Sequence, residues 1–522
     1  MDRRLAVPLA VLVSSCVWTY QSVRIAPLER PSGPRDSVAV TSPVKAHLAD
    51  GSTVVFPMGV RFVSDTIWGL GMRYDLTLRD SAPVQALALD SVVGMEAFRT
   101  HVDGGTSTIV SLVATGGVIL GAAAAIVAIS CINDPKCFGS CPTYYSDSAG
   151  AAVLEAEGFS YSIAPLFEAR DVDRLRLAAV RDGAVQLEVR NEAFETHYIN
   201  YLALLEVRHA TDELVLPDQQ NRPLAVRDAA GVTRARDRQG RDVKALLGAA
   251  DGAVYRTDPQ ILARARAGDL QDWVELAVPV RPGADSAALV LRLRNSLLNT
   301  VLFYDIMLGD PGARSLDWVA RDLEQVGPAV DLAQWYQRTM GMQVAVWDGV
   351  AYRDVAHLKD TGPVAWKDVA IVVPVLEDDS VRIRLSFPAD NWRIDRVMVA
   401  AGFRRPVAIV HPLTDVRDGA GRSDTTARAS LAAADEHYLE TSAGQRFTAE
   451  FRVDTGVAAS RTFLVASQGY YTEWVRRGWL AAPRSARTFV PSDSALAEAI
   501  GRWRVTQDTL EARFMATRVP VR

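Results

Sequence analysis

Apolar and polar residues alternate along much of the chain after residue 150. The alternation is clear at residues 185–189, 289–293 and 381–387. A period of two puts one face of a β-strand in the core and the other in water. We therefore expect a mainly β protein that is built from antiparallel strands.

The strand signals after the hydrophobic run group into tandem β-sandwich-like units. We expect a β-sandwich-like region at 132–310, a second sandwich at 342–403, and a further β segment at 438–490. The stretch 404–437 is rich in alanine, glycine and aspartate, and it predicts a linker. The end of the second sandwich, Trp392-Arg393-Ile394-Asp395, resembles the last strand of galactose-binding-like jelly rolls.

The N-terminal part carries a separate β signal at 44–101. Short apolar runs follow one another there, and the turn Asp50-Gly51 favours a tight hairpin. Five short strands in so few residues predict a small barrel of the SH3 or Sm type. Such barrels often bind peptides or RNA, but no basic and aromatic stripe is present, so a structural adaptor is the favoured interpretation.

Helical periodicity marks two regions after the first sandwich. Spacings of three and four residues predict a two-helix insert at 311–341, with Pro328 between its helices. A C-terminal helix is expected at 491–522. Its apolar stripe consists of Leu496, Ile500, Trp503, Leu510 and Phe514.

A hydrophobic run at 106–131 separates the barrel from the β body. Residues 109–130 contain no charged side chain, and such a helix is long enough to cross a bilayer core of about 30 Å. Gly117 and Gly121 have the spacing at which membrane helices approach closely. Three alternatives remain open: a transmembrane helix, a helix buried against the protein, and a helix that self-associates.

The first residues predict export. Residues 1–15 contain Arg3 and Arg4, an apolar run and small residues, which is typical of a signal peptide. Val13-Ser14-Ser15-Cys16 resembles a bacterial lipobox, which implies lipid attachment at Cys16. Val17 then implies delivery to the outer membrane of a bacterium, with residues 16–43 as a tether. The expected partner is thus a membrane, together with other envelope proteins or glycans.

The remaining cysteines follow the hydrophobic run. Cys131, Cys137 and Cys141 can form one disulfide in three ways, which an exported protein permits. Zinc is not expected, because no histidine lies near them. Cys137-Phe138-Gly139-Ser140-Cys141-Pro142-Thr143, with the lipobox and the Gly/Ala-rich helix, resembles uncharacterised bacterial lipoproteins. That resemblance implies no activity.

Aromatic residues supply the candidate ligand-binding groups. Trp347, Tyr352, Trp366 and Trp392 fall in the 342–403 sandwich, where aromatic faces suit sugar rings. The alternative is that these side chains pack the sandwich core and its edges, and this is the favoured interpretation.

Charge and motifs narrow the function classes. The 57 basic and 62 acidic residues give a net charge of −5, which does not favour nucleic-acid binding. The sequence has no serine-hydrolase elbow, zinc-protease helix or phosphate loop, and its seven histidines are scattered. We expect a non-catalytic envelope protein that tethers, scaffolds or binds, without cofactor or metal. A glycan-binding lipoprotein is the first alternative, and a hydrolase without a recognisable motif is the second.

Overall fold

The computed structural model describes residues 37–75, 80–98, 141–265, 269–280, 283–376, 380–456, 460–516 and 521. The expected signal peptide, the lipobox Cys16, the hydrophobic run 106–131, Cys131 and Cys137 lie outside these residues. Among the described helices, none is long and apolar enough to cross a bilayer.

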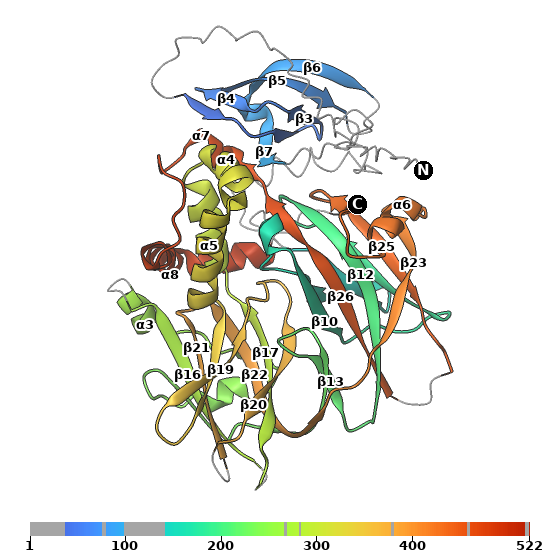
Figure 1. Cartoon of the computed structure of the whole chain (residues 1–522), viewed down its shortest axis with the longest axis vertical. Coiled ribbons are helices and arrows are strands. Elements are labelled where there is room, and N and C mark those ends of the chain that lie inside the picture. The colour runs from blue at the N-terminus through green and yellow to red at the C-terminus, as the bar shows by residue number, and fades with distance from the viewer. Residues whose placement is uncertain are drawn as a thin grey trace, which may run out of the picture.

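The prediction of a mainly β protein is confirmed. The described strands form antiparallel sheets, and helices are few. In Figure 1 the N-terminal sheet (blue) lies at one end of the molecule, and the two-sheet sandwich and the largest sheet lie side by side below it, with most of the helices between the N-terminal sheet and the sandwich.

The N-terminal sheet has eight strands in the order β1-β4-β5-β3-β2-β7-β27, with β6 paired to β5. Its last strand comes from the opposite end of the sequence, because β27 pairs with β7 through Val475 and Met95. The strands are β1 (Val38–Val40), β2 (Val44–Leu48), β3 (Thr53–Phe56), β4 (Val60–Val63), β5 (Thr66–Tyr74), β6 (Ser81–Ala88), β7 (Val92–Ala97) and β27 (Val475–Arg476), with a 3-10 turn η1 at Leu89–Ser91.

The central sheet has nine strands in the order β10-β26-β12-β23-β25-β11-β8-β9, with β24 paired to β12. One face of it and the neighbouring helices enclose the largest hydrophobic core. The strands are β8 (Thr143–Ser148), β9 (Ala151–Glu157), β10 (Ala169–Leu175), β11 (Ala184–Arg190), β12 (Glu195–His209), β23 (Ile409–Asp418), β24 (Leu439–Thr441), β25 (Arg446–Arg452) and β26 (Ser460–Glu473). The range expected as a linker, 404–437, therefore contributes β23 and the short helix α6 (Thr425–Ser430).

The sandwich consists of two five-stranded sheets around a second core. One sheet runs β13-β14-β22-β17-β20 and the other β15-β16-β21-β18-β19. The 342–403 strands thus share both sheets with strands from 214–295, and the sandwich is closed only when both parts are present. The strands are β13 (Leu214–Pro217), β14 (Pro223–Gly231), β15 (Arg234–Asp237), β16 (Gln271–Pro279), β17 (Ser286–Asn295), β18 (Met342–Trp347), β19 (Tyr352–Leu358), β20 (Lys367–Pro374), β21 (Ser380–Pro388) and β22 (Trp392–Arg404).

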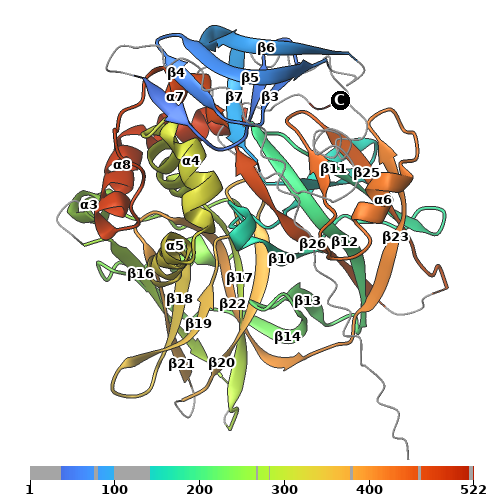
Figure 2. The same cartoon turned by 45° about the horizontal axis from the view of Figure 1, so that its top comes forward.

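The helices fill the space between the sheets. In both views α8 lies between the N-terminal sheet and the sandwich (Figure 1 and Figure 2). The predicted C-terminal helix is thereby confirmed, and Leu496, Ile500 and Trp503 of its stripe are fully buried. The helices are α3 (Pro259–Arg264), a π-helix η6 (Thr300–Gly309), α4 (Arg314–Arg321), α5 (Val326–Thr339), α7 (Arg477–Ala481) and α8 (Asp493–Ala516), with 3-10 turns η3 (Pro165–Phe167), η4 (Lys244–Leu247) and η7 (Asp322–Glu324).

Polar side chains join these units to one another. Lys367 Nζ on β20 of the sandwich lies 2.7 Å from Asp171 Oδ1 and 2.9 Å from Asp173 Oδ1 on β10 of the central sheet. The backbone N–H of Ser42 in the N-terminal unit donates to Asp317 on α4 at 2.8 Å. Buried ion pairs contribute little net stability, but removing one partner leaves an uncompensated buried charge, so the Lys367 pairs favour this way of docking the sandwich on the central sheet.

Candidate functional site

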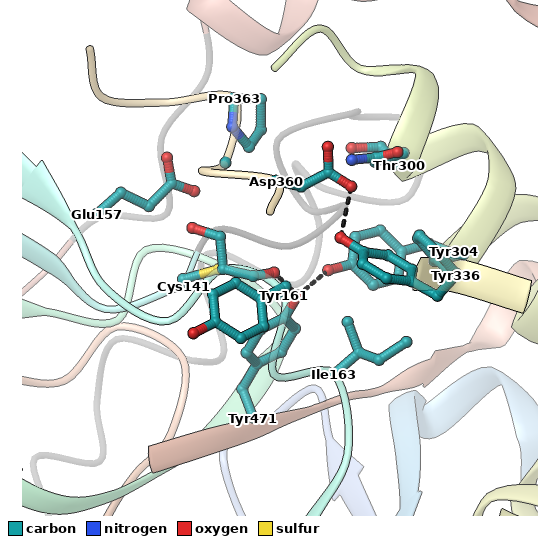
Figure 3. Close-up of a pocket in the computed structure, with 14 residues that line it drawn as sticks. Cys141, Glu157, Tyr161, Ile163, Thr300, Tyr304, Tyr336, Asp360, Pro363 and Tyr471 are labelled. Carbon is teal, nitrogen blue, oxygen red and sulfur yellow. Dashed lines mark hydrogen bonds between the residues drawn. The ribbon is translucent and has the colours of Figure 1, made fainter. Parts of the chain in front are cut away.

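A small cavity lies where the central sheet, η6, α5 and the loop after β19 meet. Its volume is about 40 Å³, roughly three times the space that one water needs. Figure 3 shows side chains from all four elements converging on it. It is lined by Cys141, Glu157, Ser160, Tyr161, Ile163, Asn299, Thr300, Phe303, Tyr304, Tyr336, Asp360, Gly362, Pro363 and Tyr471.

The π-helix η6 places three of these side chains. Residues 300–309 are apolar around nearly the whole circumference of the helix, and all but one are buried. The N–H of Asp310 donates to the carbonyl of Asp305 at 3.0 Å, which is the i to i+5 spacing of a π-helix. Gly309 lets the indole of Trp479 approach to 2.9 Å of the position that a Cβ would take. Wide π turns of this kind are rare and frequent at functional sites.

Glu157, the last residue of β9, is 2 % exposed. Its Oε2 accepts the backbone N–H groups of Val364 at 2.7 Å and Ala365 at 3.1 Å. Burial raises the pKa of Glu157 to about 8, against the lowering effect of those two hydrogen bonds. At neutral pH this carboxyl group is mostly protonated, so it can act as a proton donor.

Asp360 supplies the second carboxyl group. Its Oδ1 accepts from the side-chain amides of Asn295 at 2.7 Å and Asn391 at 2.9 Å, and its Oδ2 accepts from the hydroxyl of Tyr336 at 2.5 Å. Burial raises the pKa of Asp360 above its usual value, although these donors oppose the shift. Asp360 therefore ties the loop after β19 to the sandwich and to α5.

Hydroxyl groups and one thiol complete the lining. The hydroxyls of Tyr304 and Tyr471 are 2.7 Å apart, and that of Tyr471 donates to the Ser160 carbonyl at 2.9 Å. Cys141 is a buried free thiol in this structure. Burial and the nearby Glu157 and Glu195 carboxyls hold its pKa well above the usual value, so it is a poor nucleophile. Its expected partners, Cys131 and Cys137, lie outside the described residues, so the predicted disulfide stays a prediction.

The chemistry open to the cavity is limited by its size. Two protonatable carboxyl groups could in principle serve as an acid and base pair. However, a volume of about 40 Å³ admits a few heavy atoms and not a pyranose ring. Among the described residues, no cluster of three or more histidine, cysteine or acidic side chains could hold a metal ion.

The structure does not bring the four predicted aromatic residues together. Trp392 is fully buried, and its indole N–H donates to the Gly341 carbonyl at 3.1 Å. Trp366 lies under Arg292 and Arg294, whose guanidinium carbons are 5.6 and 5.1 Å from its ring.

The other two predicted aromatics meet in the β18–β19 hairpin. The rings of Trp347 and Tyr352 contact edge to face, with 5.2 Å between their centroids, and both side chains remain partly exposed. Arg382 lies 4.5 Å from the Trp347 ring, and Arg384 lies 4.0 Å from the Tyr352 ring. A surface pair of this kind differs from a core pair, since one side of it meets water.

Sequence reasoning missed Glu157 and Asp360. The signal for Glu157 was weak: it ends an apolar strand, residues 151–157, and precedes Phe159. A carboxylate in such surroundings indicates burial with specific partners. Nothing local marked Asp360, because its donors come from residues 295, 336 and 391.

Comparison with known proteins adds little. No protein-family model matches the sequence, and no curated protein does. The chain is similar to a solved structure described as a cycloalternan-forming enzyme from Listeria monocytogenes in complex with a pentasaccharide substrate, with 11% sequence identity and a TM-score of 0.14. The similarity covers 70% of this chain and 29% of that enzyme. Likeness at this level carries no argument about function.

Proposed function

We propose that this protein is an exported, lipid-anchored, non-catalytic component of the bacterial cell envelope, anchored in the outer membrane through Cys16. Its β body holds or binds another envelope component. The N-terminal lipobox pattern and the tether that follows it support the anchoring part of this proposal.

The observation that carries the scaffolding role is the way in which the ends of the body meet. The strand β27, near the C-terminus, completes the N-terminal sheet by pairing with β7. A tether that enters this sheet at β1 is therefore joined to β27 through one continuous sheet, in which β1 and β27 are the two end strands. Together with the ion pairs between units, this connection favours a rigid body that moves as one piece on its anchor.

The experiment tests the anchor in cells. Labelled palmitate should be incorporated into the wild-type chain and not into a Cys16→Ala variant, and the variant should leave the membrane fraction. Cys141→Ala is the matched control, because it also removes one cysteine but leaves the lipobox intact. Unlabelled wild-type protein, or a Cys16→Ala variant that stays in the outer membrane, would contradict the proposal.

A second candidate function, glycan binding, is supported by the surface pair Trp347 and Tyr352. Aromatic faces next to arginine donors suit the apolar and hydroxyl faces of a sugar. A glycan array probed with the Cys16→Ala chain should then show binding that Trp347→Ala abolishes. Trp366→Ala serves as a comparison, since that tryptophan lies outside the β18–β19 hairpin. An array without signal above background removes this candidate.

A further inference from the structure

The cavity combines aromatic rings with carboxyl groups, a combination that scaffolding alone does not use. Five of its lining residues are aromatic, and none is lysine, arginine or histidine. In Figure 3 the carboxyl groups of Glu157 and Asp360 lie on one side, and the rings of Tyr161, Tyr304 and Tyr471 gather on the other. Aromatic faces carry partial negative charge and attract cations, most of all where water is excluded.

The Glu157 carboxyl group presents an oxygen without a hydrogen-bond partner to this space. Its Oε2 is occupied by two backbone N–H groups, but its Oε1 has no hydrogen-bond partner among the described residues. The backbone of Gly362 lies against the carboxyl group, since a Cβ there would come within 2.4 Å of the Glu157 carboxyl carbon. A buried oxygen that lacks a partner destabilises the protein, and an occupant of the cavity that paired with it would remove that cost.

A second buried oxygen at the cavity also lacks a hydrogen-bond partner. Asn299 Oδ1 is buried without a partner among the described residues, and Asn299 also lines the cavity. Once Glu157 has lost its proton, its Oε1 and Asn299 Oδ1 are both acceptors, and no lysine, arginine or histidine lines the cavity. A ligand that carries positive charge therefore suits this space. The ring of Tyr161 already attracts a cation, because Lys359 Nζ lies 4.5 Å from its centroid.

Size restricts the ligand further. About 40 Å³ is room for a group of a few heavy atoms. We propose that this cavity binds a small alkylammonium cation, of a size between methylammonium and tetramethylammonium, which the tyrosine rings surround and the Glu157 carboxylate neutralises. This inference deepens the binding role proposed above and does not depend on the lipid anchor.

Binding must change the protonation of Glu157. The free protein holds a proton on this group at neutral pH, because its pKa is raised to about 8. A cation favours the carboxylate, so the proton leaves to solvent as the cation enters. Binding at pH 7 should therefore release up to one proton per cation and should tighten as the pH rises toward 8.

The test is calorimetric titration of the purified full chain with tetramethylammonium and methylammonium chlorides, in two buffers that differ in ionisation enthalpy. Sodium chloride at equal ionic strength corrects for salt, and tert-butanol serves as a neutral compound of similar size. We expect saturable binding of at least one ammonium ion with proton release, and none of tert-butanol. Absence of cation binding, or equal binding of tert-butanol, would overturn the proposal.

Variants assign the signal to the cavity. Glu157→Gln keeps the acceptor for Val364 and Ala365, and it should weaken binding about tenfold or more and abolish proton release. Glu275→Gln is the matched control, because the same substitution there removes only a surface pair with Arg384. Circular dichroism shows whether each variant is folded. A folded Glu157→Gln protein that binds like the wild type would refute the site, while the palmitate experiment would still stand or fall separately.

Discussion

At the scale of residues, Glu157 makes stability depend on pH. Below its ordinary pKa of 4.5 the side chain is protonated whether the chain is folded or not. Between pH 4.5 and about 8 only the unfolded chain loses the proton, so the free energy of unfolding falls as the pH rises. Above about pH 8 this contribution is constant. The charged or titratable groups that face Glu157 are Glu195, Arg294 and Cys141.

Glu157→Gln should remove this dependence. We expect the variant to gain stability relative to the wild type between pH 5 and pH 8, by at most about 1.4 kcal/mol per pH unit. Urea unfolding at a series of pH values measures the difference directly. The difference between the two proteins does not contain the contributions of other buried acids, such as Glu473, whose pKa is also raised by burial. If the free energy of unfolding depends on pH in the same way in both proteins, the pH dependence does not come from Glu157.

Trp503 anchors the C-terminal helix. It is fully buried, and its indole N–H donates to Asp390 Oδ2 at 2.7 Å. Trp503→Ala should lower the free energy of unfolding by about 3 to 5 kcal/mol, since it leaves a cavity and removes a donor from a buried carboxylate. Val505→Ala on the same helix, where the side chain is 75% exposed, should change it by less than about 0.5 kcal/mol. Chemical denaturation compares the two variants.

At the scale of elements, alanine substitutions at two glycines of the helical region show how backbone conformation affects stability. Gly312 has φ +58°, and a Cβ there would lie 2.6 Å from the carbonyl oxygen of Trp479. Gly312→Ala should therefore destabilise by about 1 to 3 kcal/mol. A Cβ on Gly478, in the first turn of α7, would meet nothing within 4 Å. Gly478→Ala should stabilise by about 0.5 to 1 kcal/mol. Thermal unfolding should show that the first variant is less stable than the wild type and the second is more stable.

The strands were the part of the fold that the sequence could predict. A period of two in residues 185–189 and 381–387 marks β11 and β21, because one face of each is buried. The stripe of α8 was visible for the same reason. The π-helix η6 was not, since residues 300–309 are apolar around nearly the whole circumference and leave no clear period to detect.

Pairing between distant strands escaped the sequence pattern. The alternation in 289–293 shows a strand but not its neighbours, which are β20 and β22. The candidate cavity was hidden for the same reason, because its carboxyl groups come from residues 157 and 360. Trp392 was assigned both a binding and a core interpretation, and only its burial in the closed sandwich separates them.

At the scale of the whole molecule, Trp474 lies at a junction between the N-terminal sheet and the body. The ring of Trp474 stacks on those of His47 and Phe194, with centroid distances of 3.7 and 5.7 Å. Its indole N–H donates to the hydroxyl of Thr196 at 3.0 Å. The residue directly precedes β27, so the ring fixes the strand that closes the N-terminal sheet. Gly94 on β7 leaves room for it, since a Cβ there would come within 2.9 Å of the Trp474 side chain.

Removing this ring should loosen the N-terminal sheet and leave the sandwich intact. In a Trp474→Ala variant, amide hydrogen exchange should become faster in β2 and β7, because they lose their packing against β27 and the central sheet. Exchange in β17 and β22 should not change, since a separate core holds these strands. Trp68→Ala removes an indole that is 51% exposed on the same sheet and should leave all four strands unaffected. If β2, β7, β17 and β22 all exchange faster together in Trp474→Ala, the molecule unfolds as a single unit and the junction is not a separable contact.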